Sequence, residues 1–225
     1  GWPMWAFSNH DVPRHVTRWK EHGTTDAIAR QAACLLLSFE GSICLYQGEE
    51  LGQLETDIEF HELTDPPGIR FWPEYKGRDG CRTPMVWDAS ATGGFTTGKP
   101  WLPVKPLQRE RNVADQSVDD NSVMAHYRRM LAFRRAERAL ITGKTQFLDL
   151  PEPVLAFTRG TGADAILAVF NLSPRSQVLK VAGQAALTGP SLATDLDGNH
   201  MALGPNAVAF LKASDNKPIS LSRKT

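Results

Sequence analysis

The sequence predicts an α/β fold, in which a parallel βαβ unit opens the chain and a small antiparallel β domain ends it. Two mostly apolar runs, 2–8 and 42–46, enclose an amphipathic helix over about 26–39. A strand, a helix and a strand in that order are typical of a parallel unit. After Gly143, short β-like runs alternate with Gly, Pro, Asn and Asp, which indicates an antiparallel β domain.

The first apolar run is expected to form a fully buried strand, because the polar cluster Asn9-His10-Asp11 follows it directly. The helix behind it has a cap at Thr24 or Thr25 and ends before Gly41. The second run, Ser-Ile-Cys-Leu-Tyr, reads as another buried strand. The apolar face of the helix is formed by Ile28, Ala32, Leu35 and Phe39.

A long segment, about 48–120, carries many Gly and Pro residues and is expected to be a functional loop. A second helix is predicted over about 122–140, with Val123, Tyr127, Met130 and Leu131 on one face and a solvated, ion-paired face of arginines. The predicted β runs that follow are Phe147–Leu150, Val154–Arg159, Ala165–Asn171, Gln177–Val181 and Ala207–Lys212.

Composition restricts the function classes. The 225 residues are 41% hydrophobic, and the 25 Lys and Arg balance the 25 Asp and Glu, which argues against a nucleic-acid partner. The sequence contains no run of about 18 apolar residues, so no membrane span is predicted. Three cysteines cannot all pair, so we expect them reduced and packed in a core, which favours a cytoplasmic location.

Two parallel strands cannot form a sheet that stands alone, because parallel sheets need cover on both faces. Gly1 opens directly on an apolar segment. We therefore expect the chain to be the tail of a larger (β/α) enzyme.

Chemistry in such folds lies at the carboxyl ends of strands. Three places qualify: Asn9-His10-Asp11 with Arg14, the segment 47–50, and the turn 77–82. A carboxylate beside a His and an Arg could form a metal site, half of an acid/base pair, or a clamp for a polyol. A metal site is the weakest of these, because no second His has a clear ligand spacing. A buried polar cluster with a purely structural role is a further alternative.

Several segments, in the right order, resemble the α-amylase superfamily (glycoside hydrolase family 13). Phe-Ser-Asn-His-Asp-Val-Pro-Arg at 7–14 resembles the motif after the seventh barrel strand. Tyr-Gln-Gly-Glu-Glu-Leu-Gly at 46–52 and Gly-Arg-Asp-Gly-Cys-Arg-Thr-Pro-Met-Val-Trp-Asp at 77–88 are similar to the α-glucosidase and oligo-1,6-glucosidase branch. So are Trp-Leu-Pro-Val at 101–104 and Asn-Val-Ala at 112–114 with Gln116.

The resemblance implies the fold and its division. It predicts the seventh and eighth strands and helices of a (β/α)8 TIM barrel, followed by an antiparallel β-sheet domain. The expected domains are the C-terminal portion of the catalytic barrel, 1–143, and the C-terminal β domain, 144–225.

The resemblance also implies site residues. Family members are retaining enzymes with two catalytic carboxylates, and both would lie in the missing front of the barrel. No nucleophile or proton donor is therefore assigned to Glu49, Glu50 or Asp79. Asp11 matches the transition-state stabiliser that holds the 2- and 3-hydroxyls of the glucosyl unit, and His10 donates to the same sugar edge.

Arg78 matches the arginine that recognises the 4-hydroxyl of a terminal glucose, together with an acidic partner from the missing half. Four weaker assignments accompany it. Arg82 fixes the turn, and Arg14 either orients Asp11 or is structural. Glu55 and Glu59 either contact an acceptor or are solvated loop charges. Trp72 and Tyr75 either stack on an acceptor sugar or pack on the barrel.

The implied function is that of a retaining, exo-acting α-glucosidase that hydrolyses or transfers terminal α-linked glucose of short oligosaccharides. The chain alone is expected to be inactive without the N-terminal portion of the barrel, and neither a cofactor nor a metal is assigned. Alternatives are a sucrose isomerase, a trehalose synthase or another glucosyl-transferring relative. A non-catalytic family relative acting as a subunit is also possible, although such relatives tend to lose the carboxylate that Asp11 retains.

Overall fold

A computed structural model of the chain describes residues 1–215 and 217–223. The chain forms two compact units. The first contains 1–5, 21–43 and the chain from 127 onward, and the second contains 6–20 and 44–126. These units divide the chain differently from the predicted ranges 1–143 and 144–225, which stay a prediction.

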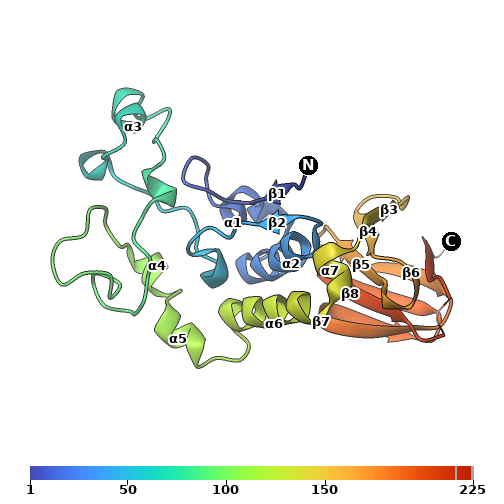
Figure 1. The fold of residues 1–225 in the computed structure, drawn as a ribbon. Coiled ribbons are helices and arrows are strands. Elements are labelled where there is room, and N and C mark those ends of the chain that lie inside the picture. The colour runs from blue at the N-terminus through green and yellow to red at the C-terminus, as the bar shows by residue number, and fades with distance from the viewer. Residues whose placement is uncertain (216, 224–225) are drawn as a thin grey trace. The chain divides into compact units, whose positions relative to one another are not determined.

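The predicted βαβ unit is confirmed in the first compact unit. Strand β1 (Met4–Trp5) pairs in parallel with β2 (Ser42–Ile43), and helix α2 (Thr25–Ser38) connects them (Figure 1). Both strands are shorter than predicted, and β1 is exposed, so the expectation of a fully buried strand is wrong for this chain. The physical reason is that a two-stranded parallel sheet has too few neighbours to be covered.

Helix α2 begins and ends as its sequence predicts. The Thr24 hydroxyl accepts a hydrogen bond from the Ala27 amide at 3.4 Å and caps the helix. At the other end, Arg134 donates to the carbonyl oxygens of Leu37, Phe39 and Gly41. The arginine was expected on a solvated face, but cationic donors satisfy the free carbonyls of a helix C-terminus.

The second predicted helix is divided in two. Helix α6 (Val123–Ala136) is followed by α7 (Arg138–Thr142), because Glu137 between them has an extended backbone. Val123, Tyr127 and Met130 are buried as expected, whereas Leu131 is exposed.

The C-terminal part forms a seven-stranded sheet in which every pairing is antiparallel, which confirms the predicted β domain. Two of its strands, β7 and β9, were not predicted, because Gly189-Pro190 interrupts the first pattern and the second is mostly polar. The strands are β3 (Thr145–Leu148), β4 (Val154–Arg159), β5 (Ile166–Asn171), β6 (Gln177–Ala182), β7 (Ala185–Asp197), β8 (His200–Ala213) and β9 (Ser220–Arg223).

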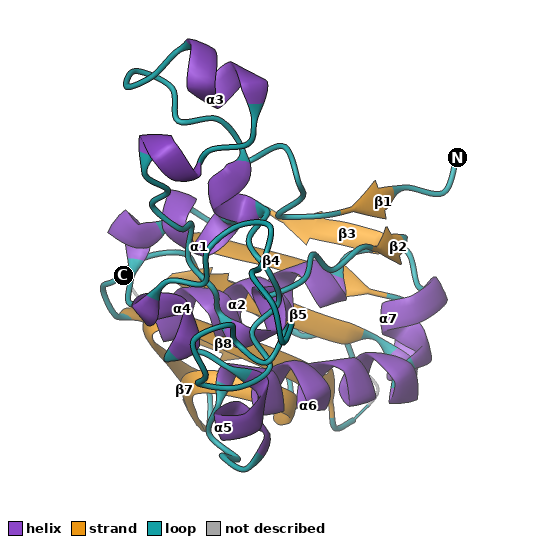
Figure 2. Cartoon of the chain, turned by 90° about the vertical axis from the view of Figure 1, so that its left-hand side faces the viewer, coloured by secondary structure: helices purple, strands orange, loops and turns teal. Residues whose placement is uncertain are grey.

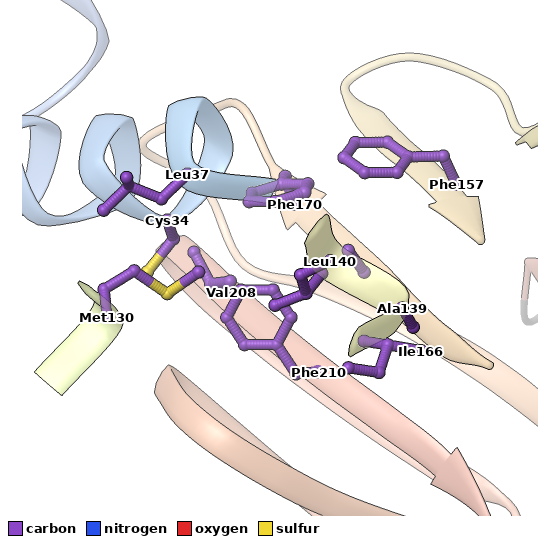
Figure 3. Close-up of a cluster of buried hydrophobic side chains, with 11 residues drawn as sticks. Cys34, Leu37, Met130, Ala139, Leu140, Phe157, Ile166, Phe170, Val208 and Phe210 are labelled. Carbon is purple, nitrogen blue, oxygen red and sulfur yellow. The ribbon is translucent and has the colours of Figure 1, made fainter. Parts of the chain in front are cut away.

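Alternation along the strands builds two apolar layers. Phe157, Phe170 and Phe210 face helices α2 and α6, which lie along one face of the sheet (Figure 2). Cys34 and Met130 complete this layer (Figure 3). The alternate positions of the same strands point to a second buried layer on the opposite face.

The predicted long loop contains short helical turns, which are listed with the other short elements below.

Of the three cysteines, Cys34 and Cys81 are buried as expected and Cys44 is exposed, which corrects that expectation. None of the helices among the described residues is long and apolar enough to cross a membrane. The short elements are α1 (His15–Arg18), η1 (Lys20–His22), η2 (Glu49–Leu51), η3 (Phe60–Glu62), α3 (Pro66–Arg70), η4 (Asp79–Cys81), α4 (Pro106–Arg109), α5 (Val113–Ser117) and η5 (Gly162–Asp164).

Candidate active site

Asp11 lies on a tight turn in the second compact unit. Its backbone amide donates to the side-chain oxygen of Asn9 at 2.8 Å, and Asn9 forms an isolated bridge with Val12. An Asn side chain that bonds the backbone two residues on closes a local turn. The side chains of Asp11 and His10 are 52% and 68% exposed.

The base of this turn is closed by local polar contacts. The Ser8 hydroxyl accepts from the His15 amide at 2.9 Å and lies 3.0 Å from the His15 ring nitrogen Nδ1. Arg18 donates to the carbonyl oxygens of Phe7 and Pro13, one on each side of the turn. These contacts therefore fix both ends of the turn formed by residues 9–12.

Three positively charged or chargeable groups surround the Asp11 carboxylate. Arg78 Nη1 and Arg82 Nη2 each lie 3.0 Å from Oδ1, and His10 Nε2 lies 3.4 Å from Oδ2. Partial desolvation raises the pKa of Asp11. The hydrogen bonds from Arg78 and Arg82 and the nearby His10 outweigh it and hold this pKa below the usual range.

Arg78 has a second acidic partner within this chain, the buried Asp65. Arg78 Nη2 lies 2.7 Å from Asp65 Oδ1, and Arg78 Nε lies 3.1 Å from Oδ2. This two-point pair lowers the pKa of Asp65 and, together with Asp11, raises the pKa of Arg78. Asp65 was not predicted, although its place before Pro66-Pro67 marks a helix start and could have drawn attention to it.

Asp79 fixes the backbone that carries Asp65. Its carboxylate accepts from the backbone amides of Thr64 and Asp65, at 2.6 and 2.9 Å, and is buried. A carboxylate that accepts from backbone amides orders a turn, and these contacts give Asp79 a structural role.

Arg82 connects the turn of 77–82 with the turn that carries Asp11. Its Nε donates to the His10 carbonyl at 2.7 Å, in addition to its contact with the Asp11 side chain. Arg82 was expected to fix its turn, and its contact with Asp11 is an additional feature that the sequence did not predict.

Arg14 lies behind the site rather than in it. The buried guanidinium donates to the carbonyl oxygens of Gln47 and Cys81, at 2.6 and 3.2 Å, and lies 5.3 Å from the Tyr46 ring centroid. Burial lowers the pKa of Arg14, partly offset by nearby acidic groups. Arg14 thus joins three segments that border the site.

Glu55 contacts Arg14 and not Asp11. Its Oε2 accepts from the Arg14 backbone amide at 2.9 Å, and its own amide donates to the Thr17 hydroxyl at 2.8 Å. Burial raises the pKa of this half-buried carboxyl. These contacts support the first turn of α1, while an acceptor role for Glu55 stays a prediction.

Of the two aromatic residues predicted to contact an acceptor, Trp72 is partly buried and Tyr75 is exposed. The Trp72 ring centroid lies 5.7 Å from that of Phe60 and 5.1 Å from Lys76 Nζ, and Tyr75 is 45% exposed. Stacking on an acceptor sugar stays a prediction. Glu59 is exposed, and its amide donates to Glu62 at 2.9 Å.

The chemistry of the Asp11 cluster follows from its charge. A carboxylate whose pKa is lowered remains ionised at neutral pH, so it is a poor proton donor and a good hydrogen-bond acceptor for hydroxyl groups. Among the described residues, no group of three or more His, Cys, Asp or Glu side chains is arranged to hold a metal ion.

A family model described as "Alpha amylase, catalytic domain" matches residues 1–143. The chain is 49% identical over 174 residues to a probable alpha-glucosidase of Rhizobium meliloti (strain 1021), a match that covers 77% of this chain and 32% of that protein. It is 30% identical over 203 residues to an oligo-1,6-glucosidase of Parageobacillus thermoglucosidasius, covering 80% of this chain and 36% of that protein.

Solved structures agree with these matches. An alpha-glucosyl transfer enzyme, XgtA, is 45% identical with a TM-score of 0.86, over 95% of this chain and 40% of that chain. The isomaltulose synthase from Erwinia rhapontici NX5 is 29% identical with a TM-score of 0.77, over 94% of this chain and 43% of that chain. The chain thus spans about a third of the length of the two curated relatives.

Proposed function

This chain belongs to the alpha-amylase catalytic-domain family, and on that basis we propose that it is the C-terminal part of a retaining, exo-acting α-glucosidase. Its fold is that of the last βα units of a (β/α)8 barrel followed by an antiparallel β domain. The proposed substrates are short oligosaccharides with a terminal α-linked glucose. The cytoplasmic location stays a prediction.

One observation carries the proposal: Asp11 and Arg78, which come from separate motifs, lie in direct contact, with Arg78 Nη1 3.0 Å from Asp11 Oδ1. In the proposed enzyme, Asp11 accepts hydrogen bonds from the 2- and 3-hydroxyls of the glucosyl unit, and His10 donates to the same edge. Arg78 binds the 4-hydroxyl, with Asp65 fixing its guanidinium plane.

The contribution of Asp11 to rate would be electrostatic. Positive charge develops on the anomeric carbon and ring oxygen during a retaining glycosyl transfer. Hydroxyl groups next to that carbon become stronger hydrogen-bond donors, so an ionised carboxylate binds the transition state more tightly than the ground state. The attacking carboxylate and the proton donor would come from the part of the barrel that precedes this chain.

The test uses the product of the full reading frame that contains this sequence. We expect it to release glucose from maltose or a p-nitrophenyl α-glucoside, and the 225-residue chain alone to be inactive. Asp11→Asn should lower kcat/KM by about 10²–10³ with the melting temperature unchanged. Asp195→Asn, an exposed carboxylate on β7, is the matched control. Near-native turnover in Asp11→Asn would refute the proposed role.

A second candidate, glucosyl transfer in place of hydrolysis, is favoured by the likeness to an alpha-glucosyl transfer enzyme and an isomaltulose synthase. The products formed from sucrose, maltose and isomaltose separate the two activities. Free glucose as the main product supports hydrolysis, and isomerised or lengthened saccharides support transfer.

A further inference from the structure

A buried polar group lies beneath the turn that carries Asp11. It consists of Ser8, His15 and Glu49. The His15 ring nitrogen Nδ1 lies 3.0 Å from the Ser8 hydroxyl and 3.5 Å from Glu49 Oε1, and the side chains of His15 and Glu49 are each 1% exposed. Within the part of the chain that the structure describes, neither Glu49 oxygen nor His15 Nε2 has a hydrogen-bond partner.

A carboxylate in this position is costly unless a cation or donor compensates it. Among the described residues, His15 Nδ1 lies within ion-pair distance of Glu49 Oε1, and it carries a compensating charge only when the ring is protonated. The buried Arg14 is also near enough for the charge of Glu49 to raise its pKa, but its guanidinium donates to the Gln47 and Cys81 carbonyls. The orientation of the His15 ring therefore decides how close a compensating group lies to the Glu49 carboxylate.

The His15 ring also contacts the residue at the base of the turn that carries Asp11. Ser8 directly precedes residues 9–12, and its hydroxyl contacts both the amide and the ring of His15. The ring lies against Phe7 and Trp19, with centroid distances of 6.0 and 5.3 Å. Glu49 begins η2, in the segment that follows β2. The three residues thus join the Asp11 turn to this second segment.

Ser8, His15 and Glu49 are the residue types of a catalytic triad of nucleophile, base and acid, but they cannot act as such a triad. Ser8 is 2% exposed, and its oxygen accepts from the His15 backbone amide. A substrate carbon has no access to such an oxygen, so a nucleophilic role is excluded on geometric grounds.

We propose that His15 is a positioning residue for Asp11 and that Glu49 orients its imidazole ring. This inference rests on the proposed function of Asp11. An exposed carboxylate on a four-residue turn depends for its angle on the base of the turn. An apolar side chain at position 15 would remove the ring contact to Ser8, leaving it only the backbone amide, and would leave Glu49 without its contact to the ring. The Asp11 carboxylate would then change its orientation while the chain stays folded.

The experiment measures how strongly each variant uses the substrate 2-hydroxyl. The full reading-frame product is assayed with a p-nitrophenyl α-glucoside and with its 2-deoxy analogue, and the ratio of the two kcat/KM values is taken. The intrinsic reactivity difference between the substrates is the same for every variant, so it cancels when ratios are compared. Loss of folded protein also cancels, because it lowers both values equally.

Asp11→Asn should lower this ratio most, by about 10². His15→Phe, which keeps an aromatic ring without Nδ1, should lower it about tenfold, through kcat rather than KM. Glu49→Gln should lower it less, and His15→Asn, which restores a polar atom near Nδ1, should recover most of it. Val16→Ala, which removes packing from the same helix, should leave the ratio unchanged.

The outcomes separate the two proposals. If Asp11→Asn leaves the ratio unchanged, the proposed function of Asp11 fails. If Asp11→Asn lowers it but His15→Phe does not, the function stands and the positioning inference is overturned. An equal effect of Val16→Ala and His15→Phe would also overturn it, since general packing would then explain the loss.

Discussion

Arg78 divides its guanidinium between two carboxylates, with Nη1 3.0 Å from Asp11 and Nη2 2.7 Å from Asp65. Asp65 is buried and Asp11 is half exposed. The buried carboxylate therefore anchors the arginine, and the arginine in turn presents one N–H group to the exposed carboxylate. Sixty-seven positions separate Arg78 from Asp11, so only folding brings them together.

Asp65→Asn should weaken this anchor and lower the free energy of unfolding by about 1–3 kcal/mol at pH 7. The pKa of Asp65 is lowered in the fold by hydrogen bonds from Arg78. Its contribution is therefore complete above the ordinary Asp pKa of about 4 and is lost as the pH falls through the lower folded value. Urea unfolding at several pH values should show the variant and the parent converging in acid. A constant difference down to pH 2 would contradict this.

Arg82→Met should raise the pKa of Asp11, because Arg82 is one of the groups that lower it. In the full reading-frame product, the acid limb of the pH profile of kcat/KM would then move to higher pH, provided that ionised Asp11 is required. Arg82→Lys keeps the charge and should move the limb less. An unchanged acid limb in Arg82→Met would show that this contact does not influence the reaction.

Gly48→Ala should destabilise the segment after β2. Gly48 has φ +85°, and a Cβ atom there would lie 2.8 Å from Arg14 Nη1. The strain of a left-handed backbone adds to that clash, and together they should lower the unfolding free energy by at least about 1 kcal/mol. Thermal unfolding provides the measurement. Gly98→Ala, at a glycine without a positive φ or a close neighbour, is the matched control and should be near neutral.

Arg159→Met tests how helix α2 is held on the β domain. The buried Arg159 donates to the carbonyl oxygens of Ser38, near the end of α2, and of Gly143. Methionine fills a similar volume but leaves these oxygens without donors, so we expect a loss of about 1–3 kcal/mol in unfolding free energy. Equal or greater stability would mean that desolvating the charge costs more than its hydrogen bonds contribute.

Thiol labelling tests the placement of the cysteines. In the 225-residue chain, Cys44 is exposed and should react rapidly with a disulfide reagent at pH 8. Cys34 and Cys81 are buried, and burial raises the pKa of Cys81 to about 11, so both should react only on unfolding. Rapid reaction of all three thiols in the native chain would contradict the fold. In the full reading-frame product, Cys44 should react more slowly if further barrel strands cover β2.

Local pattern was sufficient for much of the architecture. The spacing of Ile28, Ala32, Leu35 and Phe39 predicted α2, and Thr24 marked its start, because helix periodicity and capping depend on neighbouring residues. Strands β4 and β5 were predicted nearly to the residue, since short apolar runs between turn residues are also local signals. The long β7 was not predicted, because its pairing with β8, and not its own pattern, makes it a strand.

The sequence by itself determined which polar residue types follow the predicted strands, and those types left a metal site, half of an acid/base pair and a polyol clamp as alternatives. Tertiary structure decided which of them meet. Asp65 contacts Arg78 from within this chain, while the outside partner stays a prediction. Arg82 contacts Asp11, and Glu55 contacts Arg14 behind the site. Contacts between segments dozens of residues apart depend on how loops close and on which charges are buried, and neither quantity can be read from a local stretch of chain.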